Sequence, residues 1–125
     1  MEKKLNSDKI IEKMKKIKNV NSIHLFGSQV TGKTTKFSDV DICITGKLRD
    51  KEKLNIFKEF SKYDVSFFNE LPIWIKIRVF RNGEIIYVKD KHQLYNLLFS
   101  TIKEYEDFLP LIKRRVIEKF GKWQI

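Results

Sequence analysis

Acidic side chains and a glycine turn lie close together in this sequence, in a pattern suited to phosphate chemistry. Asp39 and Asp41 alternate in an apolar run that predicts a strand, so both carboxylates project from one face. Gly27 and Ser28 end an earlier apolar run, and ten residues separate Ser28 from Asp39. Paired carboxylates can hold hard cations such as Mg²⁺, and a glycine turn lets a phosphate approach backbone N–H groups. These residues predict a phosphate-handling site.

The same stretch also satisfies a second phosphate-binding pattern, the Walker A motif. Gly27, Gly32, Lys33 and Thr34 occupy its fixed positions. A P-loop needs a following helix that aims its N-terminus at the phosphates, but only residues 35–38 separate Thr34 from the next expected strand. The P-loop is therefore the weaker alternative, although Lys33 remains a candidate nucleotide-binding residue.

A third carboxylate, Asp64, opens the next apolar run, which predicts a strand over residues 63–68. A helix expected over residues 49–62 joins it to the strand at 39–45. A strand, helix and strand in succession normally make the two strands parallel neighbours. We therefore expect Asp39 and Asp64 near the starts of adjacent parallel strands, at the same end of the sheet.

Hydrophobic periodicity indicates the remaining elements of the core. A first helix is expected from Ser7 or Asp8, followed by a strand over residues 20–26. The helix at 49–62 is expected to bury a stripe, and an apolar strand is expected over residues 84–88. The members of that stripe are Leu54, Phe57 and Phe60. These elements together predict a mixed sheet with helices packed against it.

A long helical stripe covers residues 91–119, with Pro110 expected to kink or split the helix. The ordinary interpretation is that one face of this helix covers the sheet, and contact with a partner is an equal alternative. The segment from Leu71 to Phe80 is ambiguous, because its apolar residues alternate as they do in a strand. Its neighbouring Pro72 and Gly83 suit the two ends of a helix instead.

Length and composition set the outer limits. With 125 residues the chain is expected to form one domain over 1–125, with a core at about 7–90 and a helical segment at about 91–120. Without an apolar run of 18 residues, a cytoplasmic protein with no membrane contact is expected. His24 and His92 lie too far apart in sequence for metal-ligand spacing and are expected to be structural or surface residues. Cys43 is expected to be a packing residue near the acidic pair.

The net charge of +10 raises nucleic-acid binding as a hypothesis. The basic residues are spread along the chain and interleaved with acidic ones, and no reader motif occurs. Solvated helix faces are therefore the favoured explanation of the charge, with nucleic acid left as an alternative partner.

The pattern Gly-Ser, ten residues, Asp-x-Asp and a further Asp on the next strand resembles the minimal nucleotidyltransferases of the DNA polymerase beta superfamily. Gly27, Ser28, Asp39, Asp41 and Asp64 carry it, and the resemblance covers roughly residues 7–90. It implies an α/β (α+β) fold with a small mixed β-sheet, flanking helices and a long C-terminal helix. It also favours a helix for the ambiguous segment.

The resemblance implies transfer of a nucleoside monophosphate, AMP from ATP above all, onto a hydroxyl of a partner. Two Mg²⁺ ions would be held by three carboxylates, which are also the catalytic residues: Asp39, Asp41 and Asp64. Three residues would bind the nucleotide triphosphate: Gly27, Ser28 and Lys33. Many relatives have an arginine soon after Gly-Ser, where this chain has Gln29 and Thr31.

Such small transferases resemble the antitoxins that are paired with a helical HEPN toxin and modify one of its tyrosines. The resemblance therefore implies a HEPN-type protein as the partner and a role in a toxin–antitoxin system. Two alternatives stay open at this point: a non-catalytic module that neutralises a partner by binding alone, and a nucleic-acid-directed transferase. A homo-oligomer is compatible with all of them.

Overall fold

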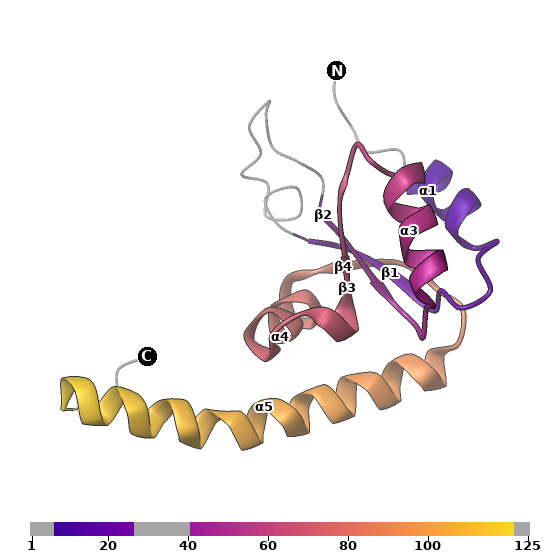
Figure 1. Ribbon diagram of the computed structural model, residues 1–125. Coiled ribbons are helices and arrows are strands. Elements are labelled where there is room, and N and C mark those ends of the chain that lie inside the picture. Colours follow the sequence, from indigo (N-terminus) through magenta and orange to yellow (C-terminus); the bar gives the residue numbers. More distant parts are fainter. Residues whose placement is uncertain (1–6, 27–40, 122–125) are drawn as a thin grey trace.

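The computed structural model describes residues 7–26 and 41–121. Four strands form one sheet in the order β3-β2-β1-β4, in which β1 is antiparallel to β2 and β4, and β2 is parallel to β3 (Figure 1). The elements are, in chain order, α1 (Ser7–Met14), β1 (Ser22–Phe26), β2 (Asp41–Thr45), α3 (Asp50–Glu59), β3 (Asp64–Phe67), a 3-10 turn η1 (Phe68–Glu70), α4 (Ile73–Asn82), β4 (Glu84–Val88) and α5 (Lys91–Phe120).

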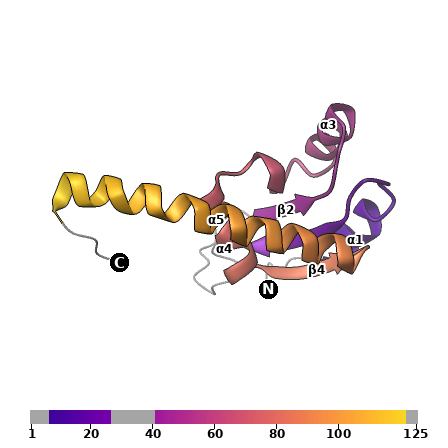
Figure 2. The ribbon, with the colours of Figure 1, turned by 90° about the horizontal axis from the view of Figure 1, so that it is seen from below.

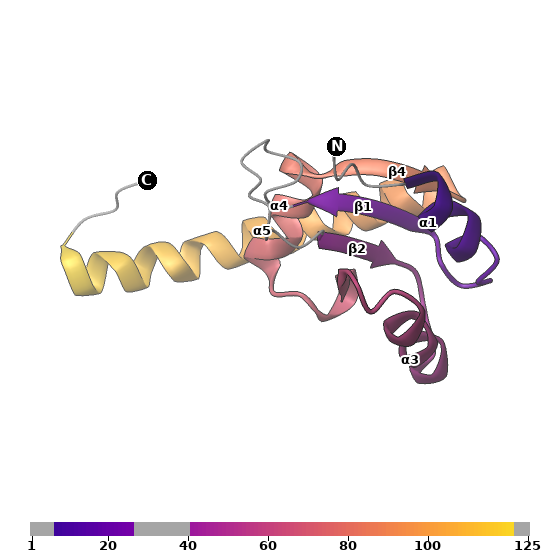
Figure 3. The same cartoon turned by 90° about the horizontal axis from the view of Figure 1, so that it is seen from above.

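The sheet is covered by helices on both faces, with α1 and α3 on one side and α4 and α5 on the other (Figures 1 and 3). The larger core lies under α1 and α3. Its buried residues are Ile10, Met14, Val20, Ile23, Leu25, Ile42, Ile44, Ile56, Phe60 and Phe67. A smaller core lies under α4 and contains Cys43, Phe68 and Val79. Full burial of one such side chain contributes roughly 1.5–3 kcal/mol, so these two layers hold the sheet in place.

Most expected elements are present, including the parallel pairing of β2 with β3 and the helix at Ile73–Asn82. The expected stripe of α3 is partly wrong. Leu54 and Phe57 are 55% and 47% exposed, and Ile56, which was not expected in the stripe, is completely buried. The helix is rotated so that Ile56 and Phe60 face the sheet. The assignment of a single domain over 1–125 stays a prediction.

The C-terminal helix α5 is continuous from Lys91 to Phe120, so Pro110 does not split it, and a kink at Pro110 stays a prediction. Proline lacks an N–H group and leaves the carbonyl one turn earlier without its helical donor. That carbonyl belongs to the exposed Glu106, where water can replace the donor. Asp90 caps the start of α5 by accepting from two backbone N–H groups, and Gly121 ends it in the left-handed region.

Beyond the contact between Trp74 and Phe108, the last turns of α5 extend past the sheet and past α4, and no described element lies alongside them in the three views (Figures 1, 2 and 3). Among the described residues, no helix combines the length and the apolar character that crossing a membrane requires.

Candidate functional site

Three strand ends meet at one end of the sheet. The last residue of β1, Phe26, is the Cα partner of Asp41, which begins β2. Asp41 is in turn the Cα partner of Asp64, which begins β3. Neighbouring strands lie about 4.8 Å apart, so the two acidic residues are adjacent. The crossover through α3 thus brings together two of the three predicted carboxylates.

Both carboxylates belong to the face of the sheet that α4 covers. Side chains alternate along a strand, so Asp41 shares its face with Cys43, and Cys43 packs against Phe68 and Val79 beneath α4. Asp64 pairs with Asp41 in register and therefore belongs to the same face. Asp41 is half-buried and Asp64 is exposed. Asp64 is consequently the more accessible of the two to an incoming substrate.

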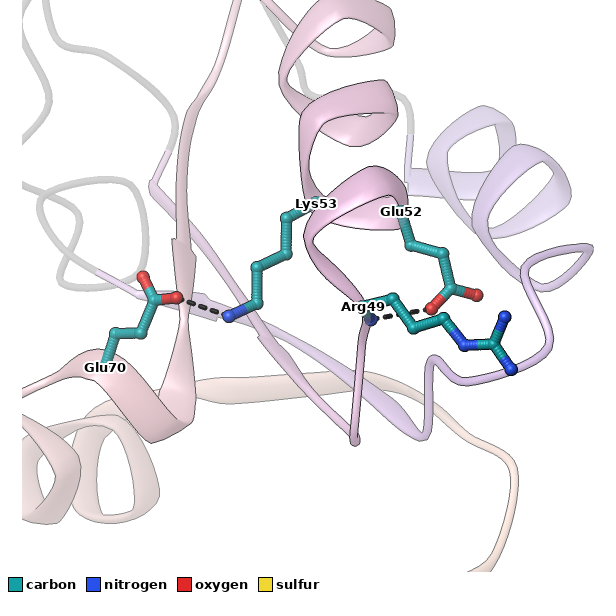
Figure 4. Close-up of polar contacts among 4 residues, drawn as sticks. All are labelled: Arg49, Glu52, Lys53 and Glu70. Carbon is teal, nitrogen blue, oxygen red and sulfur yellow. Dashed lines mark hydrogen bonds and ion pairs between the residues drawn. The ribbon is translucent and has the colours of Figure 1, made fainter.

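Strand β3 is held in position by contacts from α3 and η1. Lys53 of α3 forms an ion pair with Glu70 of η1 (Figure 4), and its ammonium lies 5.5 Å from the centre of the Phe67 ring. The hydrogen bond to Glu70 raises the pKa of Lys53, so the pair stays charged. Phe57 contacts Phe67 edge-on at 5.2 Å between ring centres. These contacts fix the strand that carries Asp64.

The start of α3 is anchored by Glu52. Its carboxylate accepts from the backbone N–H of Arg49 at 2.8 Å (Figure 4) and from the Asn19 amide at 3.0 Å. These hydrogen bonds, the one from Arg49 first, lower the pKa of Glu52. The loop after α1 and the crossover helix are therefore joined.

A buried polar cluster fixes the register of β1 against β2. The Ser22 hydroxyl bonds with Thr45 at 2.5 Å and lies 2.8 Å from Nε2 of His24. The His24 ring contacts Phe80 edge-on, and burial lowers its pKa to about 4. A neutral, enclosed imidazole is a packing residue, in agreement with the sequence interpretation.

Cys43 is buried two residues after Asp41, and burial raises the pKa of its thiol to about 12. A buried thiol that keeps its proton at neutral pH is a poor nucleophile. Ser66 is its Cα partner and shares the face of Asp64. Ser66 was not among the predicted site residues. Its spacing of two residues from Asp64 in a strand would have predicted that both lie on the same face.

Four of the predicted site residues lie outside the described residues: Gly27, Ser28, Lys33 and Asp39. Within residues 7–26 and 41–121, no group of three or more His, Cys, Asp or Glu side chains could hold a metal ion. The adjacent carboxylates of Asp41 and Asp64 nevertheless present the hard oxygen donors that Mg²⁺ prefers. The described half of the predicted metal site thus has suitable chemistry.

Comparison with protein families gives a match to the model described as "Polymerase beta, Nucleotidyltransferase", over residues 8–92. This span includes both acidic strand starts and the Gly-Ser pair. The match therefore favours a nucleotidyltransferase over the P-loop interpretation of the same stretch.

A protein of Methanocaldococcus jannaschii named "putative protein adenylyltransferase" is 37% identical to this chain over 94 residues, 75% of this chain and 76% of the relative. Solved structures agree on the fold. A toxin–antitoxin complex with AMP-PNP contains a chain with a TM-score of 0.71 at 22% identity, covering 92% of this chain and 98% of that one. A Shewanella oneidensis MNT antitoxin in complex with a tri-AMPylated HEPN toxin gives a TM-score of 0.62 at 21% identity, covering 91% and 94%.

Proposed function

Because the chain belongs to the polymerase beta nucleotidyltransferase family, we propose that it transfers AMP from ATP to a hydroxyl group of a partner protein. The observation that carries this proposal is the in-register pairing of Asp41 with Asp64 at the end of the sheet where β1 leads into Gly27. The name of the 37% identical relative supports AMP as the group and protein as the acceptor.

The acceptor hydroxyl attacks the α-phosphorus of ATP, a new P–O bond forms, and the bond to the β-phosphate oxygen breaks so that pyrophosphate leaves. Asp64, exposed at the start of β3, orients the hydroxyl and takes its proton. Gly27 and Ser28 hold the departing phosphates through their backbone N–H groups and the serine hydroxyl, with Lys33 as a nearby cation. Each of these roles is carried by a residue that matches the family pattern, apart from that of Lys33.

Asp39, Asp41 and Asp64 would hold two Mg²⁺ ions, which supply Lewis-acid stabilisation of the phosphate charge when bound. Carboxylates gathered at one strand end repel one another, so a cation relieves a cost that the fold otherwise bears. The chain's own contribution is to hold the carboxylates of β2 and β3 in register before the nucleotide arrives.

We propose a HEPN-type toxin as the protein acceptor, with one of its tyrosines as the modified residue. Support comes from the Shewanella oneidensis complex, in which the toxin is AMPylated and the antitoxin has the same fold as this chain. Adding AMP to a tyrosine introduces a bulky negative group at the modified surface of the toxin. The chain then acts as an antitoxin through catalysis.

Co-expression with a candidate HEPN toxin from the same genome tests this proposal. Wild-type protein is expected to relieve growth arrest and to label the toxin from α-labelled ATP. Asp41→Asn and Asp64→Asn are expected to do neither, although they still bind the toxin. Asp50→Asn is the matched control, because Asp50 begins α3 beyond the opposite end of β2 from Asp41. If both site variants relieved growth arrest, the chain would neutralise the toxin by binding alone and not by catalysis.

A further inference from the structure

Helix α5 presents far more apolar surface than the domain covers. Its buried residues, Leu94 and Thr101, both lie in its first half. Phe99 and Phe120 are 65% and 73% exposed, the highest values among the large apolar side chains of the described residues. Exposed apolar surface of this extent on a helix that projects from its domain is typical of an interaction surface.

A groove of about 770 Å³ lies along the middle of this helix, bordered on one side by Trp74 of α4. Trp74 is half exposed and lies 5.9 Å from Phe108 between ring centres. The α5 residues that line the groove are Tyr105, Glu106, Phe108, Leu109, Pro110, Ile112 and Lys113. The groove is predominantly apolar, with one acidic and one basic residue among them.

The groove residues belong to a seam with the spacing of a coiled coil. Apolar residues recur at alternating intervals of three and four, which is the a/d pattern of helices that pair along their length. They are Ile102, Tyr105, Leu109, Ile112 and Val116. The seam begins beside α4, where Trp74 borders the groove, and continues along the part of α5 that extends past the domain (Figures 1 and 2).

A second row, spaced by seven residues, flanks this seam. In order it consists of Phe99, Glu106, Lys113 and Phe120, all of them exposed. The order is apolar, acidic, basic, apolar. An identical row running in the opposite direction therefore matches it at every position, with each acid opposite a base and each phenylalanine opposite a phenylalanine.

We propose that two copies of this chain pair through α5 in antiparallel orientation, with the two-fold axis close to Pro110. In this register Leu109 packs against Ile112 of the second copy, and Tyr105 packs against Val116 of the second copy. The flanking row places Glu106 opposite Lys113 of the second copy and Phe99 opposite Phe120 of the second copy. Two-fold symmetry makes each of these contacts twice, as in other isologous interfaces.

The second copy is favoured as the occupant because the complementarity lies within one sequence. The net charge of +10 opposes non-specific self-association, so pairing needs a local match of opposite charges. The flanking row provides that match. In the pair, the two most exposed phenylalanines, Phe99 and Phe120, also cover each other. The flanking row from Phe99 to Phe120 is about 32 Å long, which corresponds to about three heptads. This inference does not depend on adenylyl transfer.

Sedimentation velocity of the purified full-length chain tests the pairing. The wild-type protein is expected to sediment as a dimer of the 15.0 kDa chain at micromolar concentration. Glu106→Lys and Lys113→Glu each place two like-charge contacts in the dimer and are expected to raise its dissociation constant by about tenfold or more. Circular dichroism checks that each variant is folded.

An equimolar mixture of the two variants gives the decisive result. The lysine introduced at position 106 of one variant then faces the glutamate introduced at position 113 of the other. The remaining pair is native, so the mixture is expected to dimerise as the wild type does. Arg114→Glu is the matched control, because Arg114 is exposed and lies one position off the row; dimerisation should persist. A monomeric wild type, an unaffected Lys113→Glu dimer, or a mixture that stays monomeric would each overturn the proposal.

Discussion

Asp41 and Asp64 are Cα partners at the first positions of two adjacent parallel strands. The pairing places two acidic residues next to each other at one end of the sheet. Neighbouring carboxylates of this kind are common at sites that bind cations or substrates. The relationship therefore links the local topology of β2, α3 and β3 to the proposed chemistry.

Mg²⁺ is expected to stabilise the folded protein. A cation bound only by the folded state adds about 1.4 kcal/mol to the free energy of unfolding at ten times its dissociation constant. Thermal unfolding with MgCl₂, compared with NaCl at equal ionic strength, measures this gain. Asp41→Asn should lose most of it, whereas Asp50→Asn should keep it. Equal gains in all three proteins would argue against a metal site at Asp41.

Acid is expected to destabilise the protein through His24. Burial lowers its pKa from 6.5 to about 4, so the imidazole is neutral in the folded protein while the unfolded chain takes up a proton below pH 6.5. This contribution to stability is complete above pH 6.5. It decreases as the pH falls towards 4, by about 3 kcal/mol in total.

Urea unfolding of wild type and His24→Gln at pH 7.5 and pH 4.5 measures this effect. The difference in unfolding free energy between the two proteins should shrink or reverse at the lower pH. His92→Gln, at an exposed position of α5, should retain the pH dependence of the wild type. If His24→Gln also retained it, another group would have to explain the acid sensitivity.

Gly46 directly follows β2, has a φ of 133° and cannot accept a side chain. A Cβ atom there would lie 2.0 Å from the carbonyl oxygen of Asn19, and backbone atoms cannot move aside easily. Gly46→Ala is expected to cost about 2 kcal/mol or more, measured by urea unfolding. Gly121→Ala is the control, since φ there is 82° but no atom lies within 4 Å. If both substitutions lowered the free energy of unfolding equally, the cost would come from the positive φ and not from the contact of the added Cβ with Asn19.

The thiol of Cys43 is expected to be unreactive in the folded protein. With a pKa of about 12 and full burial, its thiol should react with a disulfide reagent at pH 8 only after denaturation. Cys43→Ala should keep its transfer activity and lose about 1 kcal/mol of stability through the small cavity it leaves. Rapid labelling of the native protein, or loss of transfer activity in the folded variant, would place the thiol in the site after all.

The sequence predicts the acidic pair because the pairing depends only on one short strand–helix–strand segment. A crossover between two apolar runs makes them parallel, and Asp64 then has to lie at the same sheet end as Asp41. The position of β1 between β2 and β4 depends on long-range pairing, which no short pattern encodes. The buried face of α3 was misjudged because rotation by one residue exchanges Phe57 for Ile56, and only tertiary packing decides between them.

The remaining half of the site, from Gly27 to Asp39, rests on its sequence pattern and on the family match. The stripe on α5 shows a further limit of sequence reasoning. Its periodicity correctly indicates a helix, yet periodicity is the same for a face that covers the sheet and for one that meets another molecule. Only the structure shows that Leu94 of this stripe is buried whereas Ile102 is 39% exposed.

Catalysis by the paired carboxylates is best judged by intact-mass analysis of the purified toxin partner, after incubation with ATP, Mg²⁺ and either wild type or Asp64→Asn. The wild type is expected to add the mass of AMP to a tyrosine of the toxin. The folded Asp64→Asn variant is expected to be slower by at least about a hundredfold. Equal AMP addition by both proteins, or none by a folded wild type bound to its toxin, would contradict adenylyl transfer through Asp64.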